Sequence, residues 1–150
     1  MIDPTTQLSE NFTLGELVAS STAARLGIDN SPTPEQVEKL RWLAANLEAV
    51  RALLGFPLHV DSGFRCLNLN RALRSLDASQ HVKCEAIDFV CPQFGVPLGI
   101  VKAIIASTIQ FDQCIQEGTW VHISFSEAPR REVLTAIFKD GSVTYVQGIA

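Results

Sequence analysis

The sequence lacks the features of a membrane protein or of an exported one. No stretch approaches the roughly 20 consecutive apolar residues of a membrane-spanning helix. The first residues show no basic region followed by an apolar run, which a signal peptide would have. Internal repeats and low-complexity tracts are also absent from the sequence. We therefore expect a soluble protein that is made in the cytoplasm without a signal peptide and has no membrane partner.

Positive charge is scarce as well. Twelve Lys and Arg residues stand against sixteen Asp and Glu residues, which gives a net charge of -4 and a pI of about 5.3. A protein that binds nucleic acid through its phosphates needs a basic surface. We therefore expect no nucleic-acid partner.

Cysteines are few and are not spaced as metal ligands. The four of them form no CxxC pair, and no export signal places them in an oxidising compartment (Cys66, Cys84, Cys91 and Cys114). This pattern favours reduced and mostly buried thiols over a disulfide framework or a zinc site made of cysteines.

What the chain does contain is enough apolar residues for one core. With 47% hydrophobic residues over 150 positions, we expect a single domain spanning residues 1–150, and a monomer. Apolar periodicity predicts helices at 14–20, 23–26, 34–54, 67–73 and 97–107, and strands at 58–62, 86–90, 111–116, 119–125, 133–138 and 142–146. This order predicts an α+β fold in which helices pack on one face of a small, mainly antiparallel sheet.

Three polar side chains on or beside the predicted strands could hold a metal ion. Asp88 lies on the strand face opposite Ile87 and Phe89, and His122 lies opposite Val121 and Ile123. Together with His81 they offer nitrogen and oxygen donors for a catalytic zinc that keeps one position open. A histidine on a strand is more commonly a structural, hydrogen-bonded residue, so spacing alone leaves both interpretations open.

Several segments resemble one family. Residues 79–88 read SQHVKCEAID and resemble the SxHxxGxAxD motif of the zinc D-Ala-D-Ala carboxypeptidases and related peptidoglycan peptidases, a group that includes the hedgehog signalling domain and many phage endolysins. The WVH at 120–122 is similar to the family's WxH segment, and the SGFR at 62–65 is similar to its SGYR segment. Residues 11–13, 27–30 and 111–113 are similar to the small, single-domain, phage-type branch.

The resemblance implies a function and a cofactor. His81, Asp88 and His122 would bind Zn²⁺, with water in the fourth position, and zinc brings the pKa of such a water to about 7. The implied activity is hydrolysis of peptide bonds in peptidoglycan stem peptides, as a D-Ala-D-Ala carboxypeptidase or as a stem-peptide endopeptidase. The implied role is that of a phage or prophage lysis enzyme, which reaches the cell wall after holin-type release.

The resemblance also suggests catalytic residues. The family's acid is often found three residues before the last histidine, where this chain has Thr119, so Glu117 is our candidate base and Asp112 is the alternative. By strand parity Glu117 falls with Ile115 on the apolar side, so we expect a bend at Gly118 to turn it toward the metal. Arg65 would stabilise the developing oxyanion or a substrate carboxylate, although a surface salt bridge is its simpler role.

Two further residues are candidates for substrate binding, and one residue departs from the motif. Ser79 would hydrogen-bond substrate or cap its loop, and Trp120 would line the site or pack beside it, whereas His59 has no motif and no expected metal role. Cys84 replaces the motif glycine, which would strain the backbone if φ is positive there, and it places a thiol near two ligands. Thr119 and Cys84 motivate an alternative function: a zinc-binding cell-wall or virion module of the same fold without turnover.

Overall fold

The computed structural model describes residues 2–149, and Met1 and Ala150, the ends of the predicted domain, lie outside the described residues. The chain divides into two compact units, each built from two segments. The first unit contains the chain up to Glu48 together with Val60–Ile87, and the second contains Ala49–His59 together with the chain from Asp88 onward. The expectation of one domain over 1–150 stays a prediction.

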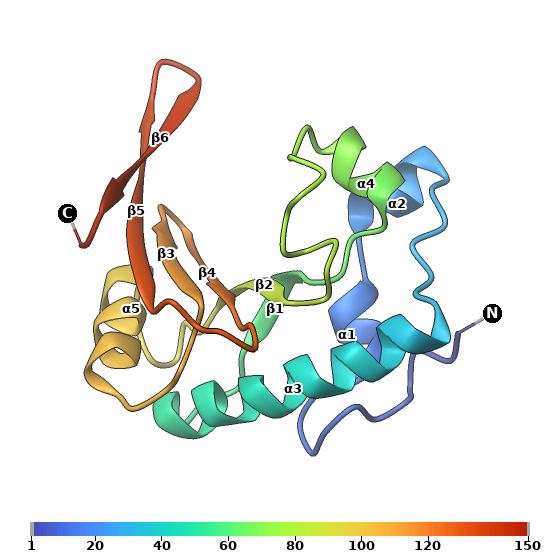
Figure 1. The fold of residues 1–150 in the computed structure, drawn as a ribbon, viewed down its shortest axis with the longest axis horizontal. Helices are drawn as coiled ribbons and strands as arrows, with labels where there is room; N and C mark the ends of the chain where they lie inside the picture. Colours follow the sequence, from blue (N-terminus) through green and yellow to red (C-terminus); the bar gives the residue numbers. More distant parts are fainter. Residues whose placement is uncertain (1, 150) are drawn as a thin grey trace. The chain divides into compact units, whose positions relative to one another are not determined.

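The fold class is α+β, as predicted. Six strands form one sheet in the order β1-β2-β4-β3-β5-β6. The sheet is mixed, because β3 pairs antiparallel with β4 but parallel with β5, while β5 and β6 form an antiparallel hairpin. Figure 1 shows the order of the elements along the chain.

The first unit carries most of the helices. It contains α1 (Leu14–Val18), α2 (Ser21–Leu26), most of α3 (Pro34–Leu54), most of β1 (His59–Ser62), α4 (Leu67–Ala72) and the start of β2 (Ala86–Val90). Helix α3 begins where the sequence predicts. The Gln36 N–H donates to Thr33 Oγ1 over 3.2 Å, and the Thr33 N–H donates to Gln36 Oε1 over 2.8 Å. This reciprocal cap satisfies two backbone donors that the first turn leaves without partners.

The second unit consists mainly of sheet. It contains α5 (Pro97–Ala106), β3 (Gln113–Glu117), β4 (Trp120–Ser124), β5 (Glu132–Lys139) and β6 (Ser142–Gln147). Helix α5 packs against β3 and β4, whose apolar face is fully buried at Cys114, Val121 and Ile123. The turn between β5 and β6 has positive φ at both Asp140 (51°) and Gly141 (77°), as in the type I′ turns that favour Asp-Gly in hairpins.

The parallel pairing of β5 with β3 depends on a charged contact in the loop that leads to β5. Asp112 is buried, and its Oδ1 accepts hydrogen bonds from Arg130 N–H at 3.1 Å and from Arg130 Nε at 3.0 Å. Its Oδ2 accepts from Arg130 Nη2 at 2.8 Å, and its backbone carbonyl accepts from the Glu132 N–H at 2.9 Å. Asp112 therefore fixes the point at which β5 begins beside β3.

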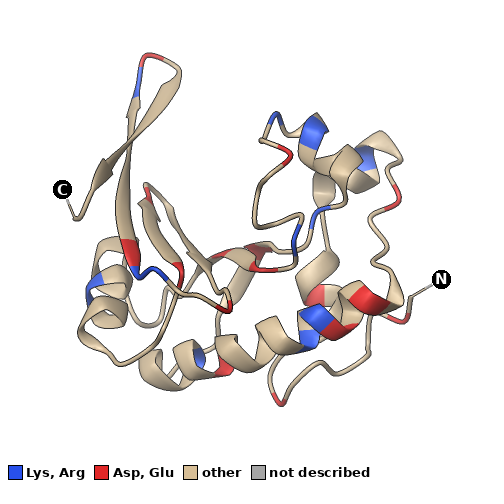
Figure 2. Cartoon of the chain, viewed as in Figure 1, with Lys and Arg blue, Asp and Glu red and all other residues tan. Residues whose placement is uncertain are grey.

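Charged residues of both signs are interspersed along the elements of each unit (Figure 2). None of the helices in the described part of the chain combines the length and apolar character that a bilayer-spanning segment needs.

Candidate metal centre

Two of the predicted ligands meet in the second unit. Asp88 lies on β2 and His122 lies on β4, and these two strands are neighbours in the sheet. The Asp88 Oδ1 and the His122 Nδ1 are 3.0 Å apart, and the two residues are only 9% and 8% exposed. A buried carboxylate and a buried imidazole are thus brought into direct contact.

The alternation of β4 explains why His122 faces away from the apolar core. Val121 and Ile123 are fully buried on one face, and His122 lies on the other. In the register of β3 and β4, Ile115 stands directly opposite His122. The side chain of Ile115 therefore lies on the same face as His122, since directly opposed residues share a face.

The third predicted ligand is held by the SGFR segment of the first unit. His81 is 3% exposed, and its Nδ1 is 2.8 Å from the carbonyl oxygen of Gly63. A carbonyl can only accept, so Nδ1 carries the proton and donates, which leaves the lone pair of this imidazole on Nε2. The backbone N–H of Arg65 also donates to the carbonyl of His81 over 3.1 Å. The segment thereby sets both the tautomer and the position of His81.

Gly63 must be a glycine for this arrangement. A Cβ at this position would overlap the carbonyl oxygen of Leu17 in α1, and the next residue, Phe64, donates its N–H to that same carbonyl over 2.7 Å. The resemblance identifies this segment, but the sequence does not predict the Gly63–His81 contact. The small residue within the motif was the one available signal.

His81, Asp88 and His122 constitute the candidate metal group found among the described residues, and one ligand atom from each lies within 4.8 Å of the others. The donor set suits zinc in a catalytic site, which takes three nitrogen or oxygen ligands at about 2.0–2.2 Å and keeps one position open. The group therefore fits the ion that the sequence suggested.

The structure corrects the predicted orientation of Glu117. Parity does group Glu117 with Ile115, but the sequence analysis assigned both residues to the apolar side. Ile115 is paired with His122 and Glu117 with Trp120, so both lie on the His122 face. No bend at Gly118 is needed, and the apolar character of Ile115 was the misleading signal.

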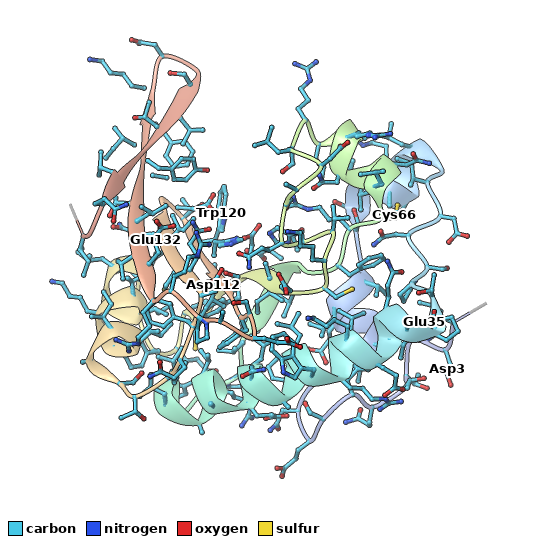
Figure 3. The ribbon with its side chains drawn as sticks, viewed as in Figure 1. Asp3, Glu35, Cys66, Asp112, Trp120 and Glu132 are labelled. Carbon is cyan, nitrogen blue, oxygen red and sulfur yellow. The ribbon has the colours of Figure 1, made fainter. Side chains whose placement is uncertain are left out.

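The alternative base, Asp112, is engaged elsewhere. Both of its carboxylate oxygens accept hydrogen bonds from Arg130. We therefore assign Asp112 to the connection that leads to β5 rather than to proton transfer. The charge and hydrogen bonds of Asp112 raise the pKa of Arg130 above its usual value. Figure 3 labels Asp112 near the start of β3 and Trp120 on β4.

Arg65 is held within the first unit. Its Nε donates to Ser62 Oγ over 3.1 Å, and its Nη1 donates to Asn70 Oδ1 over 3.4 Å. The side chain is half-buried. The predicted role of Arg65 in stabilising an anion stays a prediction.

The two candidate substrate residues differ in their contacts. Ser79 Oγ accepts the N–H of His81 over 3.2 Å, which supports the loop-capping interpretation of this serine. Trp120 packs against Phe138 with ring centroids 6.4 Å apart, and its buried indole N–H has no hydrogen-bond partner among the described residues. A buried donor of this kind calls for an explanation, and a bound ligand would supply one.

Cys84 adopts the conformation that its motif position implied. Its φ is 60°, in the left-handed region that favours glycine, so the expected strain is present. Burial raises the pKa of its thiol to about 11. The side chain is therefore a neutral thiol at pH 7, and it is not part of the candidate metal group.

The sequence matches the model of one protein family, peptidase M15, over residues 10–124. This match covers more than half of the chain and includes the SGFR segment, the 79–88 motif and the WVH segment. A comparison with curated proteins found no match. Peptidases of this family are zinc-dependent, in agreement with the donor set of the buried group. The chain therefore belongs to the peptidase M15 family.

Proposed function

We propose that this protein is a zinc-dependent peptidase that hydrolyses peptide bonds of peptidoglycan stem peptides and serves as a phage or prophage lysis enzyme. The observation that carries the proposal is the buried group of His81, Asp88 and His122, with donors suited to catalytic zinc, in a member of a peptidase family. The peptidoglycan substrate rests on the resemblance of three motifs to cell-wall peptidases.

The three ligands would hold the metal with defined geometry. Gly63 orients His81 through its carbonyl, and β2 and β4 bring Asp88 and His122 together. Zinc bound there would supply a Lewis acid that polarises the peptide carbonyl and lowers the pKa of water. Hydrogen-bonded partners such as the Gly63 carbonyl fix the direction of a ligand's lone pair, and therefore affect metal affinity.

Glu117 would transfer the proton, and Arg65 would stabilise the negative charge of the reaction. As water attacks, a C–O bond forms and Glu117 accepts the water proton; as the C–N bond breaks, Glu117 passes that proton to the leaving amine. The Arg65 guanidinium would stabilise the negative charge that develops on the carbonyl oxygen. Glu117 is our choice over Asp112 because Glu117 lies on the His122 face, while Asp112 is bound to Arg130.

Trp120 and Ser79 would contact the substrate. The indole N–H of Trp120 is a buried donor on the face of His122, so a peptide carbonyl is a suitable partner for it. Ser79 already accepts the N–H of His81, and its own O–H would donate to the stem peptide. We propose that the protein acts as a monomer on the cell wall and has no nucleic-acid partner.

Two residues favour the alternative function, a zinc-binding module of the cell wall or virion without turnover. Thr119 stands where the family often has its acid, and it cannot accept a proton. Cys84 introduces a strained residue between two ligands. Both functions require zinc, so metal binding cannot separate them, whereas turnover does.

The test is the release of new amino groups from purified cell walls by the zinc-loaded protein. We expect release by the wild type and loss of at least about 100-fold in Glu117→Gln, since general acid–base catalysis contributes about 10²–10⁴-fold. Zinc should remain bound in that variant, because the side chain is not a ligand.

Asp112→Asn is the matched variant, because it neutralises the alternative base, whose carboxylate is bound to Arg130. Any correctly folded fraction of this variant should keep the wild-type rate. Wild-type activity in Glu117→Gln would remove that residue from the mechanism, and a zinc-loaded wild type that leaves walls intact would favour the binding module.

A further inference from the structure

The β5–β6 hairpin lies beyond the segment that matches the family, which ends at residue 124. Figure 1 shows the hairpin running past the turn that joins β3 and β4 within the second unit. Its two strands carry no charge between the base and the turn (Figure 2). Several of its apolar side chains are exposed: Ile137, Phe138, Val143, Tyr145 and Val146.

Strand register places one face of this hairpin on the same side of the sheet as His122. Ile115 is opposite His122 across β3–β4, and Leu134 is opposite Ile115 across β3–β5. Residues two apart on one strand share a face, so Ala136 lies on this side, and so does its partner on β6, Tyr145. The face that holds a candidate ligand therefore continues onto the hairpin.

Tyr145 falls in the same cross-strand row as Glu117. The parallel register pairs Gln116 with Thr135, so the next residues, Glu117 and Ala136, continue the row, and Tyr145 is opposite Ala136. Two interstrand steps of about 4.8 Å separate the backbones of Glu117 and Tyr145. Ala136 lies between Glu117 and Tyr145 in this row. Because its side chain is only a methyl group, it does not separate the two longer side chains.

The electrostatic environment of the phenol agrees with this placement. Burial is the main cause that raises the pKa of Tyr145, and the negative charges of Glu117 and Asp88 raise this pKa further. The phenol is therefore protonated at neutral pH and is a hydrogen-bond donor. Tyr145 is still 49% exposed, so the donor remains accessible to a ligand.

Packing fixes the hairpin against the β3–β4 turn. The ring of Phe138 is tilted 60° against that of Trp120, with centroids 6.4 Å apart. Phe138 also covers Gly118, where a Cβ would stand 3.1 Å from Phe138 Cε2. Phe138 shares the face of Ala136, and its partner Val143 therefore lies on this side as well. The hairpin thus adds an apolar wall with one polar donor.

We propose that Tyr145 is a substrate-contacting residue, whose phenol O–H donates a hydrogen bond to a backbone carbonyl of the peptide bound at the candidate metal centre. Phe138 and Val143 provide the apolar surface along which that peptide lies. The ligand expected along this wall is the peptide substrate. Strand register makes the wall continuous with the sheet face that carries His122 and Glu117. The inference rests on the proposed function.

The test compares two variants that each lose one hydroxyl group from β6. Tyr145→Phe removes the phenol O–H and keeps the ring, and Thr144→Val removes a hydroxyl from the opposite face, where Thr144 pairs with Ile137. With a stem pentapeptide ending in D-Ala-D-Ala, or a stem peptide beginning L-Ala-D-Glu if that is the bond cut, we expect Tyr145→Phe to lower kcat/KM about 5- to 10-fold, mostly through KM. Thr144→Val should match the wild type.

A second readout needs no turnover. Tyr145 is the chain's single tyrosine, so a spectrophotometric pH titration of phenolate reports this residue alone. Glu117→Gln removes one of the negative charges and should lower the pKa of the phenol, while Asp140→Asn, at the turn of the hairpin, should leave it unchanged. An unchanged pKa in Glu117→Gln would contradict the predicted row.

The outcomes separate this inference from the proposed function. If the wild type cuts the peptide and Tyr145→Phe cuts it equally well, the role of Tyr145 is wrong and the peptidase function stands. If the wild type binds the same peptide without cutting it, and Tyr145→Phe binds it about 5- to 10-fold more weakly, the peptidase function is wrong and the role of Tyr145 stands. If the wild type neither cuts nor binds either peptide, both are wrong.

Discussion

At the scale of single residues, the structure brings the three candidate ligands together, whereas the choice of Glu117 over Asp112 as base stays a prediction. The ligand roles of His81, Asp88 and His122 came from the resemblance, because their spacing alone left a structural, hydrogen-bonded role open. Period-two alternation correctly placed Glu117 with Ile115. Alternation alone could not show which face of β3 these two residues occupy, because that depends on the pairing with β4. The apolar side chain of Ile115 indicated the wrong face.

Cys84 is the residue whose behaviour the structure changes most relative to expectation. The sequence suggested a thiol close to two of the ligands. Burial raises the pKa of this thiol to about 11, so the reactive thiolate is scarce at neutral pH. Cys84 therefore keeps the backbone conformation of the motif glycine, with the strain of a side chain there, and adds a thiol that is neutral at pH 7.

Labelling with an excess of a thiol reagent at pH 7 tests this interpretation. We expect one thiol of the native protein to react quickly, that of Cys66, because it is half-buried while Cys84, Cys91 and Cys114 are buried. Mass spectrometry of the labelled protein locates the modified residue.

Cys66→Ser is the matched control, because serine can also accept the Leu69 N–H that Cys66 Sγ accepts at the start of α4. That variant should leave no fast-reacting thiol. Rapid labelling of Cys84 in the folded protein would contradict the assignment.

At the scale of elements, helix α3 and the two hairpins agree with their local sequence signals. The caps at Thr33 and the Asp140-Gly141 turn act within a few residues, so the sequence contains them in full. The parallel pairing of β5 with β3 was not predicted, because it depends on the distant Asp112–Arg130 contact. The wall that contains Tyr145 follows from this pairing, so sequence reasoning could not find it.

The SGFR segment joins two elements by close backbone approach, and this gives a prediction for Gly63. Gly63→Ala should lower the free energy of unfolding by about 1–3 kcal/mol, because the added methyl group overlaps the Leu17 carbonyl of α1. The displaced Gly63 carbonyl should also weaken zinc binding through His81. Urea unfolding and zinc titration measure the two effects.

Gly99→Ala is the matched control for the same added methyl group. Gly99 lies in α5, and a Cβ there has no atom within 4 Å, so this variant should be more stable by up to about 1 kcal/mol and should bind zinc normally. Wild-type stability and zinc affinity in Gly63→Ala would show that the segment does not position His81.

At the scale of the whole molecule, the composition predicts which partners are absent, and those expectations stay predictions. The net charge of -4 is the basis for expecting no nucleic-acid partner, because phosphate binding needs a basic surface. The α+β class followed from the order of predicted elements. The function follows from a small set of residues far apart in sequence, whose roles came from the resemblance and the family match rather than from composition.

The central claim is that His81, Asp88 and His122 together bind one catalytic zinc ion. Its most direct test is equilibrium dialysis against zinc, followed by metal analysis, of the wild type and of single variants at the three positions. His59→Ala is the control, because it removes the chain's third histidine, which is exposed on β1. We predict one zinc per chain in the wild type and in His59→Ala, and loss of tight binding in His81→Ala, Asp88→Ala and His122→Ala. A wild type that binds no zinc, or ligand variants that bind it as tightly as the wild type, would contradict the claim.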